Sequence, residues 1–494
     1  MDRSTLARYG FAAMMMTMAH AALAATPQEV KGHFLDVPAL LKKGSDVSTS
    51  PLLANIQTPD LQTQPGAAGY RVNSAMLLNT RGKPDGFIVV VDREDGAFTA
   101  LVNTAARSGL VVGKADGTQT FQEEEKTDEQ DDYVVDPRQK AEKSSRVNRS
   151  TAPADDTQEI TLTVLAGYSD ASAQRVGDTV GFALAQIETL NMALRNTGLP
   201  HIKAVLAGVS TTSIDYEING ENLGLVQSLF PNHAKADLIA SFVSVWNGIN
   251  GIAYLNGRHS MTHVATTSTF AHEVGHNIGG IHCPQGNGYH YGYFTGEYSS
   301  LLCRSGSWYL SYSNPARLAP DGVPLGNPET ADMARVWREN APGKSSGEGN
   351  DMTRPVLLNS VAAPSECVDV LDGNMTVGAK VGLWRCDGNN PNQRWNKLYF
   401  NEMVQFWLAA SPRLCLDDEA ISENTRAVVL AQSSCQHIGW TKEGQALRIR
   451  GNAADLYLHR PGDNQLNVRM RDSGDTSRSC YWQVLDASSL TPAP

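Results

Sequence analysis

Apolar runs predict two groups of β-strands in the first half of the chain. Residues 86–91 and 97–102 are rich in Val, Phe, Ala and Leu, so they predict strands of a small N-terminal unit. A second group begins at residues 160–165, where β-branched and apolar residues alternate, and continues at 202–209 and 237–243. Residues 251–255 predict a short edge strand beside a cleft.

Apolar positions spaced three or four apart predict a long helix after the strand at 160–165. Gly198 and Pro200 mark its end. A further helix-like stretch covers residues 328–337. The spaced apolar positions are Val176, Val180, Leu184, Ile187, Leu190 and Leu194. Strand, helix, strand and strand in this order predict an α/β sheet covered by helices.

The N-terminus has the pattern of a secretory signal peptide. Arg3 and Arg8 precede an apolar run at 10–19, and small residues follow at Ala22 and Ala24. The run is shorter than the ~20 residues needed to cross a bilayer, so a membrane anchor is the weaker interpretation. We therefore expect residues 1–24 to be a signal peptide and the protein to be extracellular, without a membrane span.

The length and charge of the chain limit its organisation and partners. At 494 residues it exceeds a single domain of about 100–200 residues, so two or three domains are expected. The net charge of −11 argues against a nucleic-acid partner, because phosphate binding needs clustered Lys and Arg.

The seven cysteines all lie at or after residue 283. An oxidising compartment allows thiols to pair, and short spacings favour neighbouring partners. Cys480 is left alone. The expected pairs are Cys283 with Cys303, Cys367 with Cys386, and Cys415 with Cys435.

One short segment has the spacing of a catalytic metal site. His272 and His276 are four residues apart, so on a helix both imidazoles face the same way and can hold one ion. Gly279 can take a positive φ that ends the helix and lets His282 supply a third ligand. Three ligands leave a zinc position for water, and Glu273 is placed to take its proton.

These residues match every fixed position of the motif H-E-x-x-H-x-x-G-x-x-H, so the segment resembles the metzincin metallopeptidases. The resemblance implies one catalytic Zn²⁺, a five-stranded mixed sheet, an active-site helix and a small lower subdomain at 158–342. It also implies hydrolysis of peptide bonds in protein substrates, with Glu273 as general base. We expect a bacterial, reprolysin-like, monomeric endopeptidase.

The turn below the metal in this family carries a methionine, and Leu310 stands there in this chain. A tyrosine two positions later approaches the metal in some members. Tyr312 matches it, and we expect either an oxyanion-stabilising role or packing. Cys283 is expected to form a disulfide. The alternative is that the Cys283 thiolate binds the zinc.

The segment between the N-terminal unit and residue 160 is strongly charged. An acidic run at 123–132 precedes basic residues at 138–149, which predicts an exposed linker. Residues 25–157 are therefore interpreted as a propeptide with a charged linker. The alternative is an accessory domain that stays attached. Because this segment has no cysteine, any latency must come from a carboxylate or from steric cover.

Residues 343–351 are rich in Gly and Ser and predict a flexible linker to a further domain at 352–486, followed by a tail at 487–494. This domain has a weak repeat of about 40–48 residues. Its first unit has Cys367-Val368-Asp369, Cys386 and Gln393-Arg394-Trp395. It resembles the ricin B-type β-trefoil lectins.

In that family, polar groups bond sugar hydroxyls and an aromatic ring stacks on the sugar. The matching residues of the first unit are Asp369, Trp384, Asn392 and Gln393. The alternative is that this pattern only packs the trefoil. For the whole chain, the competing hypothesis is a secreted carbohydrate-binding protein or toxin component whose zinc site is inactive or structural.

Overall fold

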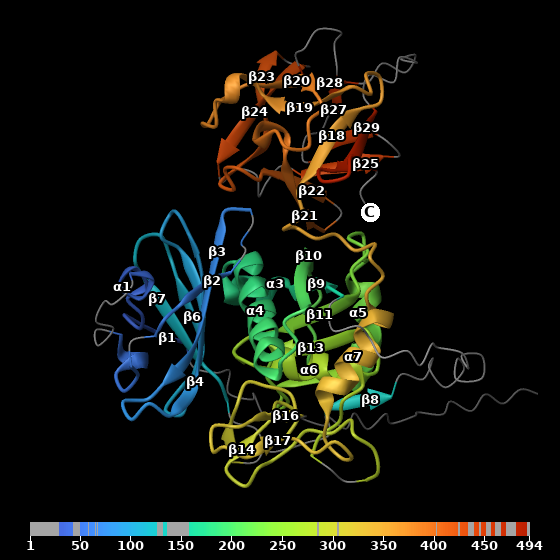
Figure 1. The fold of residues 1–494 in the computed structure, drawn as a ribbon. Coiled ribbons are helices and arrows are strands. Elements are labelled where there is room, and N and C mark those ends of the chain that lie inside the picture. The colour runs from blue at the N-terminus through green and yellow to red at the C-terminus, as the bar shows by residue number, and fades with distance from the viewer. Residues whose placement is uncertain are drawn as a thin grey trace, which may run out of the picture.

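A computed structural model describes residues 29–491 apart from 43–49, 58, 65, 67, 126–131, 136–157, 284–285, 304–305, 402, 423–424, 433–438, 444–445, 451–455, 460–465 and 471–480. The described chain forms an N-terminal sheet, a central α/β region and a C-terminal all-β domain (Figure 1). The expected signal peptide and most of the charged linker lie outside the described residues.

The N-terminal unit is a seven-stranded antiparallel sheet with the order β1-β7-β6-β5-β4-β3-β2. Its β4 and β5 confirm the strands predicted at 86–91 and 97–102. One face packs with α1 (Val37–Leu41) and the short helix at Pro51–Leu53 into a separate core. The strands are β1 (Glu29–Gly32), β2 (Gln62–Gln64), β3 (Tyr70–Leu78), β4 (Pro84–Arg93), β5 (Phe98–Thr104), β6 (Ser108–Gly113) and β7 (Gln119–Glu123).

The central region holds a mixed sheet of order β10-β9-β11-β13-β12, in which β12 runs antiparallel to its neighbour. A further short strand, β8 (Tyr133–Val135), pairs with the outer side of β12. The four strands expected from the sequence are confirmed. The central strands are β9 (Ile160–Ser169), β10 (Ile202–Thr212), β11 (Leu238–Val243), β12 (Gly251–Leu255) and β13 (His259–His263).

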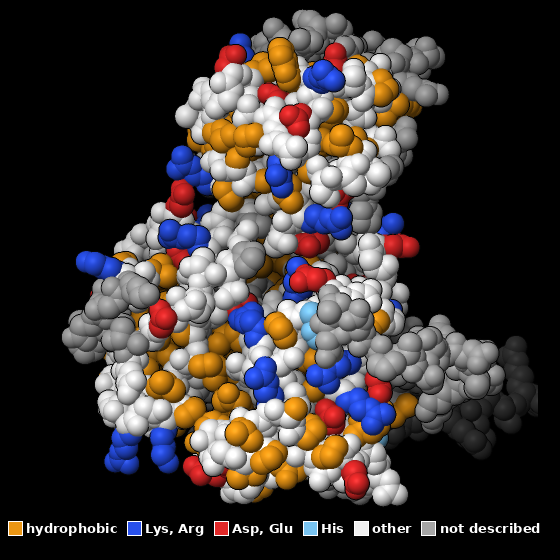
Figure 2. All heavy atoms as spheres, viewed as in Figure 1, with side chains coloured by type: hydrophobic (Ala, Val, Ile, Leu, Met, Phe, Trp, Pro, Cys, Tyr) orange, Lys and Arg blue, Asp and Glu red, His pale blue; other side chains and the backbone are white. Residues whose placement is uncertain are grey.

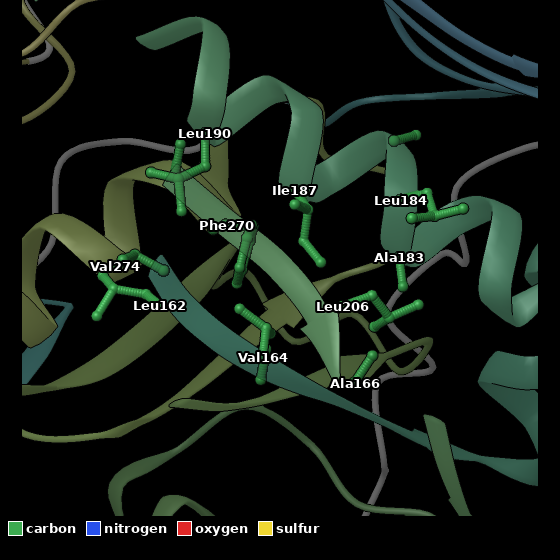
Figure 3. Close-up of a cluster of buried hydrophobic side chains, with 14 of the residues drawn as sticks. Leu162, Val164, Ala166, Ala183, Leu184, Ile187, Leu190, Leu206, Phe270 and Val274 are labelled. Atoms are coloured by element: carbon green, nitrogen blue, oxygen red, sulfur yellow. The ribbon is translucent and has the colours of Figure 1, made fainter. Parts of the chain in front are cut away.

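The helix expected across residues 176–194 is two helices, α3 (Asp170–Val176) and α4 (Thr179–Thr197). Gly177 has a φ of 72°, and the Asp178 side chain accepts from the Gly181 amide and caps α4. The single-helix prediction was wrong here because a glycine in this conformation ends α3. Leucines and other apolar side chains of α4 meet Phe270 and Val274 of α6 (Thr269–Ile278) above β9 and β10 (Figure 3).

Two further helices complete the central region. They are α5 (Gly220–Leu229) and α7 (Met333–Lys344). The helix expected at 328–337 begins later, because Asp332 caps α7 by accepting from the Arg335 amide. No helix in the described ranges is long and apolar enough to cross a membrane.

The lower part of the central region contains short strand pairs and one disulfide. The strands are β14 (Tyr298–Ser299), β15 (Ser307–Trp308), β16 (Asn314–Leu318) and β17 (Pro324–Leu325). The Cys283–Cys303 bond is present, as is Cys367–Cys386 in the C-terminal domain, so both predicted pairs are confirmed. Cys415 is also disulfide-bonded, but its expected partner Cys435 and the remaining Cys480 lie outside the described residues.

The second face of the N-terminal sheet packs directly on the central region (Figure 1). Val72, Val89 and Leu101 belong to the same buried cluster as the apolar residues of α4. Polar contacts cross the same boundary: Ser74 Oγ donates to Glu188 at 2.6 Å, and the Tyr70 hydroxyl donates to Asp178 at 2.9 Å. Helix α4 is therefore covered by a sheet on each side.

The described part of the C-terminal domain contains twelve strands around its own core. It touches the central region where β21 pairs with β10 at Gly208 and Val209. Its strands are β18 (Val356–Ser360), β19 (Glu366–Val370), β20 (Val381–Arg385), β21 (Trp395–Phe400), β22 (Met403–Leu408), β23 (Leu414–Ser422), β24 (Thr425–Gln432), β25 (Gly439–Glu443), β26 (Ala446–Arg450), β27 (Leu456–His459), β28 (Asn467–Met470) and β29 (Trp482–Asp486).

The Gly- and Ser-rich segment after α7, expected to be a flexible linker, is bound along the central sheet. The Ser346 amide donates to Asp237 at 2.7 Å, and Asn350 Nδ2 donates to the carbonyls of Ala207 and Lys397. Asn350 thus ties the central region to the C-terminal domain. The small polar residues of this segment form hydrogen bonds that hold its backbone in place.

On the face seen in Figure 2, Lys and Arg side chains are interspersed with Asp and Glu. Opposite charges mixed in this way do not build the continuous basic surface that nucleic acid requires.

The interface between the N-terminal sheet and α4 predicts that a cut in the charged linker will not separate the two parts. A site-specific protease sequence placed between residues 140 and 150 would allow the cut. After cleavage, the N-terminal fragment should co-elute with the rest of the chain in gel filtration, because separation exposes fully buried Val89 and Leu101. Val89→Asp should release the fragment. Quantitative separation of the fragment without that substitution would contradict the prediction.

Candidate metal centre and trefoil site

Helix α6 carries two faces of different character. Phe270, Val274 and Ile278 point into the apolar core, while His272 and His276 lie on another face of the helix. The helix ends at Gly279, whose φ is 111°. The amides of Gly279 and Gly280 close the last turn on the carbonyls of His276 and Gly275. The chain then reverses and brings His282 back to the helix.

The three predicted histidine ligands converge in the structure. His272 Nε2 lies 3.0 Å from His276 Nε2 and 3.2 Å from His282 Nε2. The Nδ1 atoms of His272 and His276 face the carbonyls of Leu301 and Gly280 at 2.6 and 2.8 Å. A carbonyl only accepts, so Nδ1 carries the proton and each Nε2 presents a lone pair to the shared centre.

A fourth oxygen donor, from Asp132, completes the cluster. Its Oδ1 lies 2.8 Å from His282 Nε2 and 3.0 Å from His276 Nε2, and its Oδ2 lies 3.3 Å from His272 Nε2. Burial raises the pKa of Asp132, but the adjacent imidazoles, with His272 as the largest contributor among them, lower this pKa well below its usual range. Within the described residues, these four form the single group with metal-ligand geometry.

The donor set fits zinc. Tetrahedral zinc with ligand distances of about 2.0–2.1 Å places neighbouring nitrogens ~3.3 Å apart, close to the separations seen here. Three imidazole nitrogens facing one another at this distance repel unless a cation lies between them. With Asp132 included, the set is three nitrogens and one oxygen.

The position of Asp132 corrects the prediction that residues 123–132 form an exposed linker. Asp132 is 6% exposed, and Glu124 Oε2 accepts hydrogen bonds from the amide and hydroxyl of Thr267 at 3.2 and 2.8 Å. Self-repulsion disfavours packing only where carboxylates lack partners, and these two find them in the central region. The sequence offered one signal, that a chain without an upstream cysteine needs a carboxylate for latency, but seven carboxylates occupy this run.

Glu273 lies on α6 next to the histidines and is fully buried. Its carboxylate approaches Gly251, the first residue of β12. A Cβ at Gly251 would fall 2.3 Å from Glu273 Oε1 and 2.6 Å from Thr269 Cγ2. Because glycine has no side chain, Gly251 leaves the space that the Glu273 carboxylate occupies. The sequence did not reveal this role of Gly251.

The hydroxyl of Tyr312, for which the sequence predicts either an oxyanion-stabilising role or packing, is engaged within the core. Its hydroxyl donates to the Ala271 carbonyl at 2.5 Å, and its ring packs against Trp337 and Gly275. Burial raises the pKa of Tyr312 well above its usual value. Tyr312 supports α6 from the core, and Leu310 is buried in the same cluster. Packing is the alternative that the geometry favours.

The four candidate sugar-binding residues of the first trefoil unit separate into two groups. Asp369 and Trp384 lie on adjacent strands and on the same face, since Asp369 is opposite Gly382 and Cys367 is opposite Trp384. Trp384 is 59% exposed. Asn392 is the middle residue of the short helix Pro391–Gln393 and is half-buried.

Gln393 holds Asp369 rather than facing solvent. It is fully buried, and its Nε2 donates to Asp369 Oδ2 and to the Arg385 carbonyl, both at 2.9 Å. Asn390, which the sequence prediction missed, donates to the same carboxylate oxygen at 3.0 Å. Burial raises the pKa of Asp369, and the bonds from Gln393 and Asn390 lower it in part. Gln393 thus holds the Asp369 carboxylate in place, and its predicted sugar contact stays a prediction.

Comparisons with known proteins concern the C-terminal domain. Residues 354–484 match the model of the ricin-type β-trefoil lectin domain. Similar solved structures include a Macrolepiota procera ricin B-like lectin in complex with lactose (14% identity, 26% of this chain, 93% of that chain, TM-score 0.21). Another is the C-half of the earthworm R-type lectin in complex with GalNAc (13% identity, 26% of this chain, 97% of that chain, TM-score 0.20). A third is the designed 3-fold symmetric protein ThreeFoil (18% identity, 27% of this chain, 98% of that chain, TM-score 0.23).

No curated protein matched the chain. The family match covers the C-terminal quarter of the sequence, and the chain is multidomain. Its C-terminal domain is a ricin B-type β-trefoil, the type of domain that suggests carbohydrate binding.

Proposed function

We propose that the central region is a zinc-dependent endopeptidase of the metzincin type. The observation that carries the proposal is the convergence of the Nε2 atoms of three histidines, two of which lie on the helix that also carries the buried Glu273. A structural site needs ligands only, whereas hydrolysis also needs a base next to the ion. The five-strand order and the turn at Gly279 support the proposal further.

Zinc, when bound, would polarise a peptide carbonyl and make a bound water acidic. The chain contributes the rest of the chemistry. Glu273 would hold a proton taken from the attacking water and would deliver it to the leaving amine. With β8 displaced, strand β12 would offer backbone groups to an extended peptide. The Leu301 and Gly280 carbonyls keep His272 and His276 in the tautomer whose Nε2 can bind a metal.

The trefoil, in this proposal, binds glycans and brings the peptidase to glycosylated surfaces or substrates. Trp384 presents an exposed ring, and Asp369 beside it is held by two amide donors. Binding of this kind raises the local substrate concentration without changing the chemistry. The disulfides fit an extracellular setting.

A second candidate function is a carbohydrate-binding protein or toxin component with a structural zinc. The trefoil family match favours it, and so does Asp132. Four protein ligands, as seen here, are typical of structural zinc, whereas catalytic zinc keeps one position open. The two candidates differ in what Glu273 does.

In the Val89→Asp background, in which linker cleavage should release the N-terminal fragment, Glu273→Gln should abolish casein hydrolysis while leaving zinc content at one per chain. Loss of a general base lowers rates by about 10²–10⁴. The matched control is Glu221→Gln, an exposed substitution on α5. Equal hydrolysis by wild type and Glu273→Gln would end the peptidase proposal, and a wild type that binds zinc but cleaves nothing would favour the structural-zinc candidate.

Gly251→Ala should slow hydrolysis by about 10–100-fold at unchanged zinc content, because the new methyl displaces the Glu273 carboxylate. Gly224→Ala serves as the control. Its new methyl group would lie 3.5 Å from Tyr254 Oη, which is an ordinary van der Waals distance. Steady-state kinetics on a peptide substrate would measure the effect. Unchanged kcat/KM in Gly251→Ala would show that Glu273 does not need this space.

Trp384→Ala should weaken glycan binding by the full chain at least about tenfold, equal to ~1.4 kcal/mol, without lowering thermal stability. The ring is exposed, so its loss leaves no cavity. Val377→Ala, an equally exposed change, serves as control. Glycan-array screening followed by titration calorimetry provides the measurement. Binding that survives Trp384→Ala would remove the first trefoil unit as the sugar site.

A further inference from the structure

Both ends of the Cys283–Cys303 disulfide lie beside residues of the metal centre. Cys283 directly follows the third histidine, His282, in the sequence. Cys303 comes two residues after Leu301, whose carbonyl faces His272 Nδ1 at 2.6 Å. The disulfide therefore connects the residue after one candidate ligand to the segment that orients another, along a path outside α6.

The loop closed by this disulfide is compact at the same place. The Gly292 amide donates to the carbonyls of Ile281 and His282, both at 3.1 Å. A Cβ at Gly292 would fall 2.6 Å from the carbonyl carbon of Leu302 and 2.8 Å from the backbone nitrogen of Cys303. The middle of the loop thus contacts both of its ends, and it leaves no room for a side chain at Gly292.

His282 depends on this loop more than the other two histidines do. Those two are held on α6, whereas His282 follows the end of that helix and is partly buried. Its backbone is held by the hydrogen bond from Gly292, by an isolated β-bridge between Ile281 and Tyr291, and by the covalent bond at Cys283. The loop is therefore the support of the returning ligand.

We propose that Cys283 and Cys303 are positioning residues of the metal centre and that their disulfide sets its affinity for zinc. The bond holds His282 close to the other ligands, and through Leu301 it keeps His272 in the tautomer whose Nε2 can bind a metal. Loss of an outer-shell support of this kind lowers metal affinity by about 10–100-fold. The inference rests on the zinc site that both candidate functions share, and it does not depend on peptidase activity.

The trefoil contains a matched disulfide for comparison. The Cys283–Cys303 and Cys367–Cys386 bonds have sequence separations of 20 and 19 residues. In each pair one cysteine is fully buried and the other is partly buried. Because loops of nearly equal length restrain the unfolded chain by a similar amount, removal of either bond should lower thermal stability similarly. The two pairs differ in that the first adjoins the metal centre.

The test measures the zinc affinity of the full chain by competition with a colorimetric zinc chelator. Cys283→Ala/Cys303→Ala should raise the zinc dissociation constant at least about tenfold. Cys367→Ala/Cys386→Ala should leave the constant unchanged. Thermal unfolding of both double variants without zinc should show similar losses of stability, so a general loosening of the chain would not produce the difference in zinc affinity.

Gly292→Ala provides a second variant, which keeps the disulfide and remains informative if the double variant folds poorly. Its new methyl group must displace the backbone at Leu302 and Cys303, so its zinc affinity should also fall, whereas Gly224→Ala should behave as wild type.

Equal zinc affinity in wild type, Cys283→Ala/Cys303→Ala and Gly292→Ala would overturn the inference. An equal loss of zinc affinity on removal of the trefoil disulfide would overturn it as well. A wild-type chain that binds no zinc would instead contradict the zinc site of both candidate functions, and this inference with it.

Discussion

The central region is organised by the need to hold three imidazole lone pairs around one point. His272 Nε2 lies about 3 Å from the Nε2 atoms of both His276 and His282, and the ligand atoms of all three histidines lie within 4.8 Å of one another. Such an arrangement is repulsive without a cation, and the surrounding structure maintains it nevertheless. Gly279 turns the chain, backbone carbonyls fix two of the rings, and Tyr312 supports α6 from below. Together these features hold the three histidines in an arrangement that a bound cation would stabilise.

The structure places the Asp132 carboxylate against all three histidines. Four protein ligands are typical of structural zinc sites, whereas the proposed peptidase needs a base such as the buried Glu273 on the same helix. The trefoil adds a separate recognition surface, joined to the central region through β21 and Asn350.

The sequence predicted those features that depend on local spacing. The positions of His272, His276, Gly279 and His282 fix a helix, a turn and a returning ligand within eleven residues, and all are found. Two disulfides between near neighbours were predicted for the same reason. Periodicity also located the central strands, though it could not show that Gly177 divides one long helix into α3 and α4.

Contacts between distant parts of the chain were not predictable. Asp132 lies about 140 residues before the histidines, among other acidic residues with no distinguishing pattern. Gly251 matters only because β12 passes Glu273 in space. Gln393 matched a sugar-binding motif, but its burial beneath Asp369 depends on the packing of β19 and the short helix at Pro391–Gln393.

Zinc K-edge X-ray absorption on the full chain, together with metal analysis, tests the central claim most directly. The account predicts one zinc per chain with three imidazole nitrogens and one carboxylate oxygen, and loss of that zinc in His276→Ala but not in His233→Ala, a change at an exposed histidine. Zinc that is absent from the purified chain, or retained equally by His276→Ala, would contradict it.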